Sequence, residues 1–345
     1  MNIDLSALGW TGGNGAGSLR PGRVTRVDRG VCTVLCAEGP VRASLAGRML
    51  ATAAGDLSRL PAVGDWVRIG LWPDERTTVE EVLPRRSLLS RRTAGKDASA
   101  QVLAANMDAV AVVEPVHPEP DLPRIERLLA LAFESGAQPL VVLSKADLAA
   151  DAEMITRDLA RVAPGVPVLP VSAEHGTGID LLRPYVAAGR TLALLGRSGA
   201  GKSSLVNALV DAEVLTTQAI RRADGKGRHT TTYRTLVPVP GGGAVIDTPG
   251  VRGVGLLDAA DGLDQAFADV AELIDCCRFA DCAHRLEPGC AVRAALADGE
   301  LSLRRWESWE KLQREVAYET GRQRSRPRGG RQFGRPVRPR NRRSG

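Results

Sequence analysis

Two different patterns of hydrophobic and polar residues follow each other along the chain. Between residues 22 and 83, short runs of apolar and β-branched residues alternate with Gly, Pro and Asp at short intervals. Such spacing is typical of a small all-β barrel or sandwich, and five or so short strands suit an OB-type barrel best. Beyond about residue 108, fully apolar runs alternate with segments whose apolar residues recur every three or four positions. This second pattern predicts a parallel sheet covered on both faces by amphipathic helices.

Three helices can be placed from their own sequences. Residues 124–136 carry apolar side chains on one helical face, with Asp121 as a start signal and Gly136 as a stop signal. A second helix is expected over about residues 151–163. A third, beyond residue 300, carries an apolar stripe whose members we expect to serve mostly in packing, not in nucleic-acid stacking. The stripe consists of Leu303, Trp306, Trp309, Leu312 and Val316.

The segments outside these patterns complete the expected organisation. Residues 1–18 are rich in glycine, and we expect them to be unfolded. The basic stretch PRRSLLSRRTAGKD, residues 84–97, is expected to be a linker or a second surface that faces phosphates. The predicted division is a disordered start (1–20), an OB-fold domain (21–95), an α/β domain (96–257), a mainly helical domain (258–320) and a disordered tail (321–345).

Composition adds a charge asymmetry to this picture. The chain has 345 residues, 43% of them hydrophobic, and no apolar run of 18 residues, so we expect a soluble, cytoplasmic protein without membrane contact. The net charge of +6 is unevenly distributed, because residues 322–345 hold ten Arg and no acid and leave −4 for the remainder. A cationic arm of this kind favours contact with RNA or DNA over the alternative of a merely solvated tail.

A phosphate-binding loop is the strongest motif of the chain. The sequence GRSGAGKSS matches G-x-x-x-x-G-K-[ST] and stands between an apolar strand and a helical segment, as the motif requires. Its backbone N–H groups would point at phosphate oxygens beside the positive end of the helix. Lys202 would contact the β- and γ-phosphates, and the Ser203 hydroxyl would bind Mg²⁺. The expected phosphate-binding residues are Gly196, Arg197, Ser198, Gly199, Ala200, Gly201, Lys202, Ser203 and Ser204.

Two segments after this loop indicate a switch that responds to the γ-phosphate. In AVIDTPG, Asp247 can hold Mg²⁺ through water, and the Gly250 N–H can meet the γ-phosphate. In GRHTTTYRT, one threonine among residues 230–232 can contact Mg²⁺ and the γ-phosphate; the sequence does not decide among them, and Thr231 is taken as the candidate. Such segments order when the γ-phosphate is present and relax once it leaves.

The water-positioning residue of many GTPases is missing from its usual place. Val251 follows Gly250 where those enzymes carry a glutamine, and an apolar side chain cannot orient the attacking water. We therefore expect slow intrinsic hydrolysis, with the missing group supplied by rearranged switch residues or by a partner. His229 is a candidate, although a lone loop histidine more often has a structural or solvent-facing role.

A base-reading loop precedes the phosphate loop. SKAD directly follows the apolar strand PLVVL, so that Asp147 can accept hydrogen bonds from guanine N1–H and N2–H₂ while Lys145 lies along the base. VSAEHGTG also ends a strand, and its backbone can meet guanine O6. The expected base-binding residues are Ser144, Lys145, Ala146, Asp147, Ser172 and Ala173. Because all these loops would lie at one edge of one sheet, their order indicates a circularly permuted GTPase domain.

A cluster of cysteines near the C-terminus indicates a metal site. Cys277, Cys282, His284 and Cys290 offer three thiolates and an imidazole within fourteen residues, a set that suits one structural, tetrahedral Zn²⁺. Cys276 is spare, although it could compete with Cys277 as a ligand. Cys32 and Cys36, by contrast, lie on one face of a single strand, where core packing is expected.

In combination, these motifs resemble one known family, the ribosome-small-subunit-dependent GTPases of bacteria, or RsgA/YjeQ family. The resemblance extends from about residue 22 to residue 319 and includes GDWV, PRRSLLSRR, SKAD, SAEHGTG, GRSGAGKSS, GRHTTT, DTPGVR and the Cys/His cluster. It implies an N-terminal OB domain, a permuted GTPase domain and a C-terminal zinc domain. It further implies a monomer that binds the small (30S) ribosomal subunit and 16S rRNA, hydrolyses GTP under stimulation by that subunit, and assists its late maturation.

One position departs from the pattern, and two other functions compete. Ser144 stands where GTPases usually carry Asn or Thr, so we expect a weaker stabilising contact in the base pocket, with guanine preference kept by Asp147. A metabolic P-loop kinase or ATPase is disfavoured by SKAD and SAEHGTG. A nucleic-acid-binding module with a vestigial nucleotide site is disfavoured by the intact Lys202, Ser203 and Asp247.

Overall fold

The N-terminal strands close into a barrel. The computed structural model describes residues 2–12, 19–53, 56–92, 100–215, 234–248 and 259–324. Strands β1 (Leu19–Asp28), β2 (Val31–Cys36), β3 (Gly39–Leu45), β4 (Trp66–Leu71) and β5 (Thr77–Val82) form a closed barrel in the order β1-β2-β3-β5-β4. Helix α1 (Gly47–Ala53) and the 3₁₀ turn η2 (Leu57–Arg59) connect β3 to β4. The expected OB-type barrel is confirmed, and Cys32 and Cys36 are both buried in its core.

The start of the chain is ordered, contrary to the expectation. Residues 6–8 form the 3₁₀ turn η1 (Ser6–Leu8), and Leu5 and Leu8 are buried against the main core. The Ala7 carbonyl accepts hydrogen bonds from the N–H groups of Gly189, at 2.8 Å, and Gly243, at 2.7 Å. The prediction of an unfolded start is therefore wrong for residues 2–12, because a few apolar side chains among the glycines are enough to dock the segment.

The stretch expected to be a linker contributes a strand. β6 (Leu88–Arg92) pairs antiparallel with β7 (Ala100–Ala105). Ahead of it, the Arg85 side chain turns inward and donates to both carboxylate oxygens of the fully buried Asp65, at 2.8 and 2.7 Å, and to the Ser58 carbonyl at 2.6 Å. The linker interpretation is thus corrected for residues 84–92, because Arg85 serves the fold. The alternative that the stretch presents a second surface facing phosphates stays a prediction.

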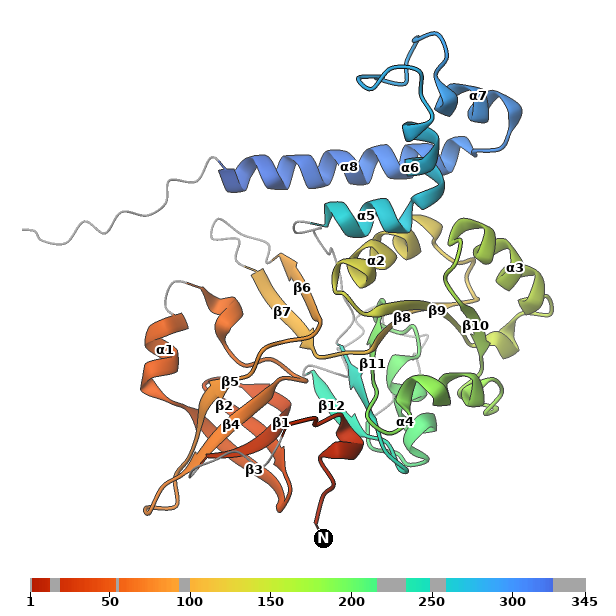
Figure 1. Ribbon diagram of the computed structural model, residues 1–345. Helices are drawn as coiled ribbons and strands as arrows, with labels where there is room; N and C mark the ends of the chain where they lie inside the picture. Colours follow the sequence, from red (N-terminus) through yellow and green to blue (C-terminus); the bar gives the residue numbers. More distant parts are fainter. Residues whose placement is uncertain are drawn as a thin grey trace, which may run out of the picture.

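A six-stranded sheet forms the centre of the molecule (Figure 1). Its order is β10 (Val168–Val171), β9 (Gln138–Ser144), β8 (Ala109–Pro115), β11 (Thr191–Leu195), β13 (Ala244–Asp247) and β12 (Thr235–Pro238). All neighbours are parallel, as expected, except β12, which pairs antiparallel with β13 at the edge. The pattern of apolar runs does not distinguish such an edge strand from a parallel one.

Helices cover both faces of this sheet. Residues of α2 (Leu122–Glu134) and α3 (Ala152–Val162) pack on the face that carries Val110 and Val112, and both helices confirm their expected positions. The opposite face, with Ala111 and Val113, is covered by the 3₁₀ helix η4 (Ile179–Val186) and by α4 (Lys202–Val210). The Asp121 side chain caps α2 by accepting a hydrogen bond from the Arg124 N–H at 3.0 Å.

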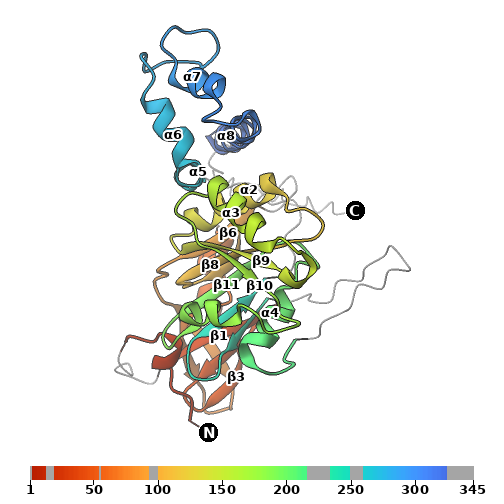
Figure 2. The ribbon, with the colours of Figure 1, turned by 90° about the vertical axis from the view of Figure 1, so that its right-hand side faces the viewer.

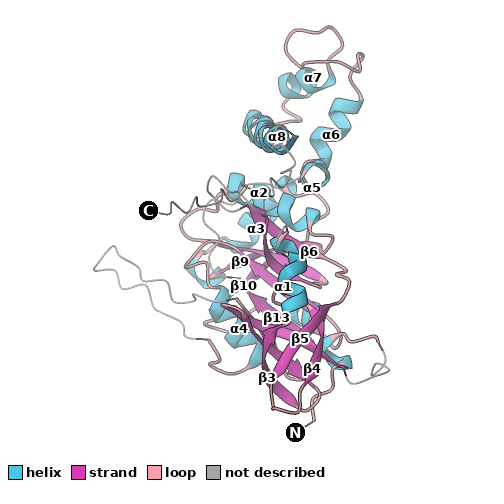
Figure 3. Ribbon diagram, turned by 90° about the vertical axis from the view of Figure 1, so that its left-hand side faces the viewer, coloured by secondary structure: helices cyan, strands magenta, loops and turns pink. Residues whose placement is uncertain are grey.

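Among the described residues, four helices follow the sheet: α5 (Ala260–Ala266), α6 (Ala268–Asp275), α7 (Ala291–Asp298) and α8 (Leu303–Arg324). Of these, α5 and α8 contact α2, whereas α6 packs on α5 and α7. Figures 2 and 3 show these helices at one end of the molecule and the barrel at the other. The Gly262 N–H of α5 donates to Glu134 of α2 at 3.0 Å, and a Cβ at Gly262 would lie 2.2 Å from the Ala130 carbonyl oxygen.

The apolar stripe of α8 serves packing, with one exception. Trp306, Leu312 and Val316 are buried, whereas Leu303 is 61% exposed. The expectation that most of the stripe packs is therefore confirmed. Within the described ranges, no helix is both long and apolar enough to cross a membrane.

Candidate functional site

Several loops that carry candidate residues leave the same edge of the central sheet. β9, β10, β11 and β13 run parallel, so their carboxyl ends meet at that edge. Ser144 ends β9, Ser172 directly follows β10, the GRSGAGKSS loop follows β11, and Asp247 ends β13. This is the position at which open α/β sheets bind ligands. The sequence order differs from the spatial order, because the SKAD loop comes first in the chain.

The GRSGAGKSS loop wraps around its own lysine. Lys202 begins α4 and is buried, and its Nζ donates to the carbonyl oxygens of Gly196 and Arg197, both at 2.9 Å. Gly199 and Gly201 have φ angles of +79° and +90°, which a residue with a side chain adopts only under strain. Burial lowers the pKa of Lys202, and the negative charge of Asp247 opposes that shift. The loop can thus present a fixed cation and backbone N–H groups to an anion.

An oxygen-rich corner lies at the end of β13. The Ser203 hydroxyl donates to Asp247 Oδ2 at 3.0 Å. Asp247 is almost fully buried, and its Oδ1 has no hydrogen-bond partner in the described part of the chain. Burial raises the pKa of Asp247, although Lys202 and Ser203 act in the opposite direction. A hydroxyl and a carboxylate with an unused buried oxygen are ligands of the type that Mg²⁺ prefers, so these residues fit that ion.

The SKAD loop is joined to the phosphate loop by a hydrogen bond. The Ser144 side chain is buried, and its hydroxyl donates to the Ala200 carbonyl at 2.6 Å. Lys145, at φ +57°, turns the chain into the 3₁₀ turn η3 (Ala146–Leu148), which presents Asp147 at the surface. We expected serine at position 144 to make a weaker stabilising contact than Asn or Thr. The structure shows that Ser144 does make a contact, its hydrogen bond to Ala200, and the comparison of strength with Asn or Thr stays a prediction.

The VSAEHGTG loop, the second segment expected to bind the base, is closed on itself. The Ser172 N–H donates to the Thr177 carbonyl at 2.9 Å, and the Ser172 hydroxyl accepts from the His175 N–H at 3.2 Å. Ala173 follows at the same edge of the sheet as SKAD. The remaining predicted residues, His229, Thr231 and Gly250, lie outside the described residues.

The Cys/His cluster is assembled. The Sγ atoms of Cys277 and Cys290 each lie 3.6 Å from Nδ1 of His284 and 4.0 Å from each other, and all four ligand atoms, with that of Cys282, lie within 4.8 Å. Tetrahedral zinc with bonds of ~2.3 Å to sulfur and ~2.0 Å to nitrogen needs ligand separations of roughly 3.5–3.8 Å. The donor set and its spacing fit zinc. Cys276 is exposed and outside the cluster.

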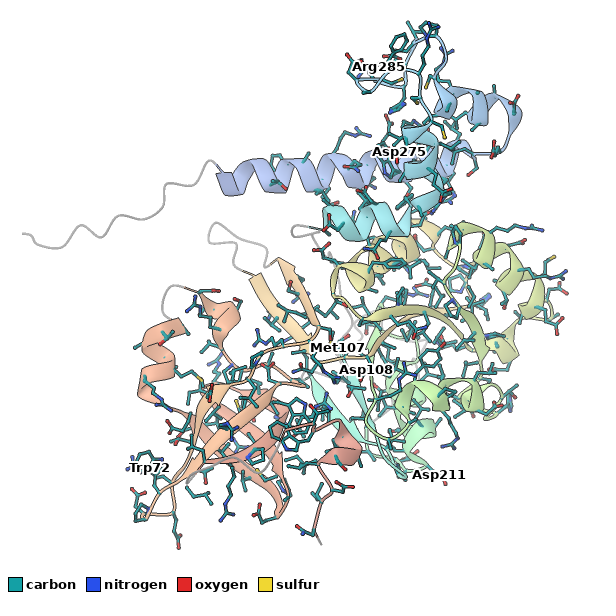
Figure 4. The ribbon with its side chains drawn as sticks, viewed as in Figure 1. Trp72, Met107, Asp108, Asp211, Asp275 and Arg285 are labelled. Carbon is teal, nitrogen blue, oxygen red and sulfur yellow. The ribbon has the colours of Figure 1, made fainter. Side chains whose placement is uncertain are left out.

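The loop that carries these ligands is organised by one carboxylate. Glu287 accepts hydrogen bonds from the N–H groups of Ala283, Arg285 and Leu286, at 3.1, 2.8 and 2.9 Å. Backbone N–H donors, its own first, lower the pKa of Glu287 to about 2. Figure 4 shows Arg285 at the tip of this loop, at the outer end of the C-terminal helices.

One residue close to the phosphate loop was not predicted. Glu114, near the end of β8, is 1% exposed and directly follows Val113, whose carbonyl oxygen would lie 2.3 Å from a Cβ on Gly196, the first residue of the loop. A single acid in the otherwise apolar run AVAVVEP is the signal that could have drawn attention to it.

Comparison with known proteins agrees with this architecture. The family model described as RsgA GTPase matches residues 82–257. The small ribosomal subunit biogenesis GTPase RsgA of Streptomyces coelicolor is 52% identical over 321 residues, covering 90% of this chain and 86% of its own. The protein of the same name from Opitutus terrae is 44% identical, covering 92% and 90%.

Solved structures share the fold. YjeQ from Thermotoga maritima superposes with a TM-score of 0.63 at 29% identity, covering 87% of this chain and 99% of its own. YloQ, described as a circularly permuted GTPase, gives a TM-score of 0.57 at 23% identity, covering 90% and 97%, and supports the fold alone. With the matched family model and relatives above 40% identity along most of its length, the chain belongs to the RsgA GTPase family.

Proposed function

We propose that this chain binds GTP at the carboxyl edge of its central sheet and hydrolyses it to GDP and phosphate during assembly of the small ribosomal subunit. The hydrogen bond from Ser144 to Ala200 carries the proposal, because it joins a guanine-reading loop to a phosphate-binding loop. A kinase or an ATPase would need no SKAD loop at this position. Family membership and the names of the relatives support the same assignment.

The residues would divide the work as follows. Asp147 and Lys145, with the backbone at Ser172 and Ala173, would bind guanine, and residues 196–204 would bind the phosphates. Ser203 and Asp247 would hold Mg²⁺, which neutralises charge on the β- and γ-phosphates when bound. Lys202, held across its own loop, would stabilise the charge that develops on the transferred phosphoryl group. The roles of His229, Thr231 and Gly250 rest on the sequence.

The surroundings of this site would provide the ribosomal contacts. The relatives are named for biogenesis of the small ribosomal subunit, which supports 16S rRNA as the surface bound by the barrel, the C-terminal helices and the Arg-rich tail. Zinc at Cys277, Cys282, His284 and Cys290 would be structural. We further propose a cytoplasmic monomer with domains over residues 21–95, 96–257 and 258–320, flanked by the terminal segments.

The decisive experiment measures turnover of GTP and ATP by the full chain, with and without purified small ribosomal subunits. We expect GTP to be preferred and its turnover to rise when subunits are added. Preference for ATP, or turnover of GTP that subunits do not change, would contradict the proposal. Truncation after Arg324 tests the tail separately, because loss of phosphate contacts lowers the salt dependence of RNA affinity.

A further inference from the structure

Glu114 lies beside the first turn of the phosphate loop. β8 and β11 run parallel, and Leu195, the last residue of β11, lies beside Val112. Continued by two residues, this register sets Arg197 beside Glu114. The loop does follow β8 at its start, because a Cβ on Gly196 would lie 2.3 Å from a backbone oxygen of β8. The loop thus leaves the sheet close to Glu114, while among the described residues the carboxylate of Glu114 is paired only with Arg124.

The Glu114 side chain belongs to the face of the sheet that α2 covers. Val112 and Leu195 pack in the core cluster that includes the residues of α2, and side chains two positions further along a strand lie on the same face. Arg124, in the first turn of α2, reaches this place and donates from Nη1 to Glu114 Oε1 at 2.8 Å. The carboxylate of Glu114 thus stands between a helix and the phosphate loop.

Each of the two facing groups has an unused buried atom. Glu114 is 1% exposed, and its Oε2 has no hydrogen-bond partner among the described residues; the same holds for Nε of Arg197. Burial raises the pKa of Glu114, while the positive charges of Arg124 and Arg197 oppose the shift. Buried polar atoms without partners are costly, so an acid and a cation placed together in this way complement each other.

The backbone of Arg197 connects this pair to the site. Its carbonyl oxygen is one of the two that hold Lys202 Nζ, at 2.9 Å. Fixing the Arg197 side chain under the loop therefore fixes the peptide that orients Lys202. We propose that Glu114 is a positioning residue of the phosphate loop, whose buried carboxylate attracts the Arg197 guanidinium and thereby holds Lys202 toward the β- and γ-phosphates. This inference rests on the proposed nucleotide site and adds a residue that acts through Arg197.

A double-mutant cycle on the full chain tests the pairing. The variants are Glu114→Gln, Arg197→Gln and the double substitution, with fluorescently labelled GDP and a non-hydrolysable GTP analogue as probes. Because Lys202 contacts the γ-phosphate, each single variant should lose about tenfold in its affinity for the GTP analogue relative to GDP. The double variant should lose no more than a single one, and Arg197→Lys, which keeps the charge, should recover most of the loss.

A matched control separates positioning from stability. Glu126→Gln also alters a buried carboxylate that binds arginines, but its partners Arg304, Arg305 and Ser308 all lie on α8. It should lower the melting temperature and leave the ratio of the two affinities unchanged. Two results would overturn the positioning role without contradicting the proposed nucleotide site. One is a loss of affinity in the double variant equal to the product of the two single losses; the other is an affinity ratio in Glu114→Gln equal to that of the wild type. If Glu114→Gln does not fold, Glu114→Asp replaces it in the cycle, because the shorter side chain keeps the negative charge and moves the carboxylate away from Arg197. A wild-type chain that binds neither probe would instead remove the proposed function itself.

Discussion

Substituting Ser144 by alanine tests whether the two ligand loops are held together by one hydrogen bond. The serine hydroxyl donates to the Ala200 carbonyl at 2.6 Å, and both residues are buried. Alanine removes the donor and leaves the carbonyl without it in a site where water is largely excluded. Nucleotide binding would then have to align the two loops, and this alignment would make the free energy of binding less favourable.

The size of the effect follows from the burial of the bond. Leaving a buried acceptor unsatisfied costs about 1–3 kcal/mol. A loss of about 1.4 kcal/mol in the free energy of binding corresponds to a tenfold loss of affinity. We expect Ser144→Ala to weaken binding of labelled GDP about tenfold in an equilibrium fluorescence titration, and Ser144→Thr, which keeps the hydroxyl, to bind more tightly than the alanine variant.

The chain offers a matched control for this measurement. Ser87 is also buried, and its hydroxyl donates to the Met107 carbonyl at the same 2.6 Å. Figure 4 shows Met107 where the barrel meets the sheet. Ser87→Ala should lower stability by a similar amount and leave GDP affinity unchanged. Equal nucleotide affinity for Ser144→Ala and the wild type, or an equal loss in the Ser87 variant, would refute the reasoning.

Three further predictions concern the connections between regions. Glu126→Ala removes the more deeply buried of the two carboxylates that bind Arg305 and should cost about 3–5 kcal/mol in urea unfolding, while less than 1 kcal/mol would show that Asp269 suffices. Deleting residues 2–12 removes two buried leucines and a hydrogen-bond acceptor of Arg23, so the melting temperature should fall by several degrees; no change would deny the segment a structural role. Chelation of zinc should expose its thiols to a thiol reagent and lower the melting temperature, and thiols equally reactive before chelation would contradict a closed site.

Features that depend on residues close together in the sequence could be predicted well. Strand, loop and helix around residues 196–204 each carry their own signal, and Asp121 caps α2 as its position suggested. The four metal ligands lie within fourteen residues, so their spacing alone indicated the site. That the base-reading loop and the phosphate loop meet also followed from strand order, although the bond from Ser144 did not, because its acceptor is a backbone carbonyl that no side-chain motif reveals.

Features that depend on distant partners were missed or misinterpreted. The basic stretch 84–97 suggested a linker or a surface that faces phosphates, but its Arg85 binds a carboxylate twenty residues earlier, in the barrel. The Gly-rich start suggested disorder, but Trp10 packs against Trp66 with their ring centroids 5.0 Å apart. In both cases the prediction followed the average composition of the segment. The position of the segment in the structure is instead determined by a few of its side chains.

Buried acids mark the positions at which such distant contacts must occur. A carboxylate inside a core requires a cation or several hydrogen-bond donors, so an acid within an apolar pattern predicts that a partner exists. For Glu114 the partner Arg124 is ten residues away, on the helix that follows its strand, and could be inferred from that unit alone. For Glu126 the partner Arg305 is 179 residues away, and only the folded chain identifies it. Glu114 thus attaches the first turn of α2 to β8, and Glu126 attaches the same helix to α8, so that α2 connects the central sheet with the C-terminal helices that carry the Cys/His cluster.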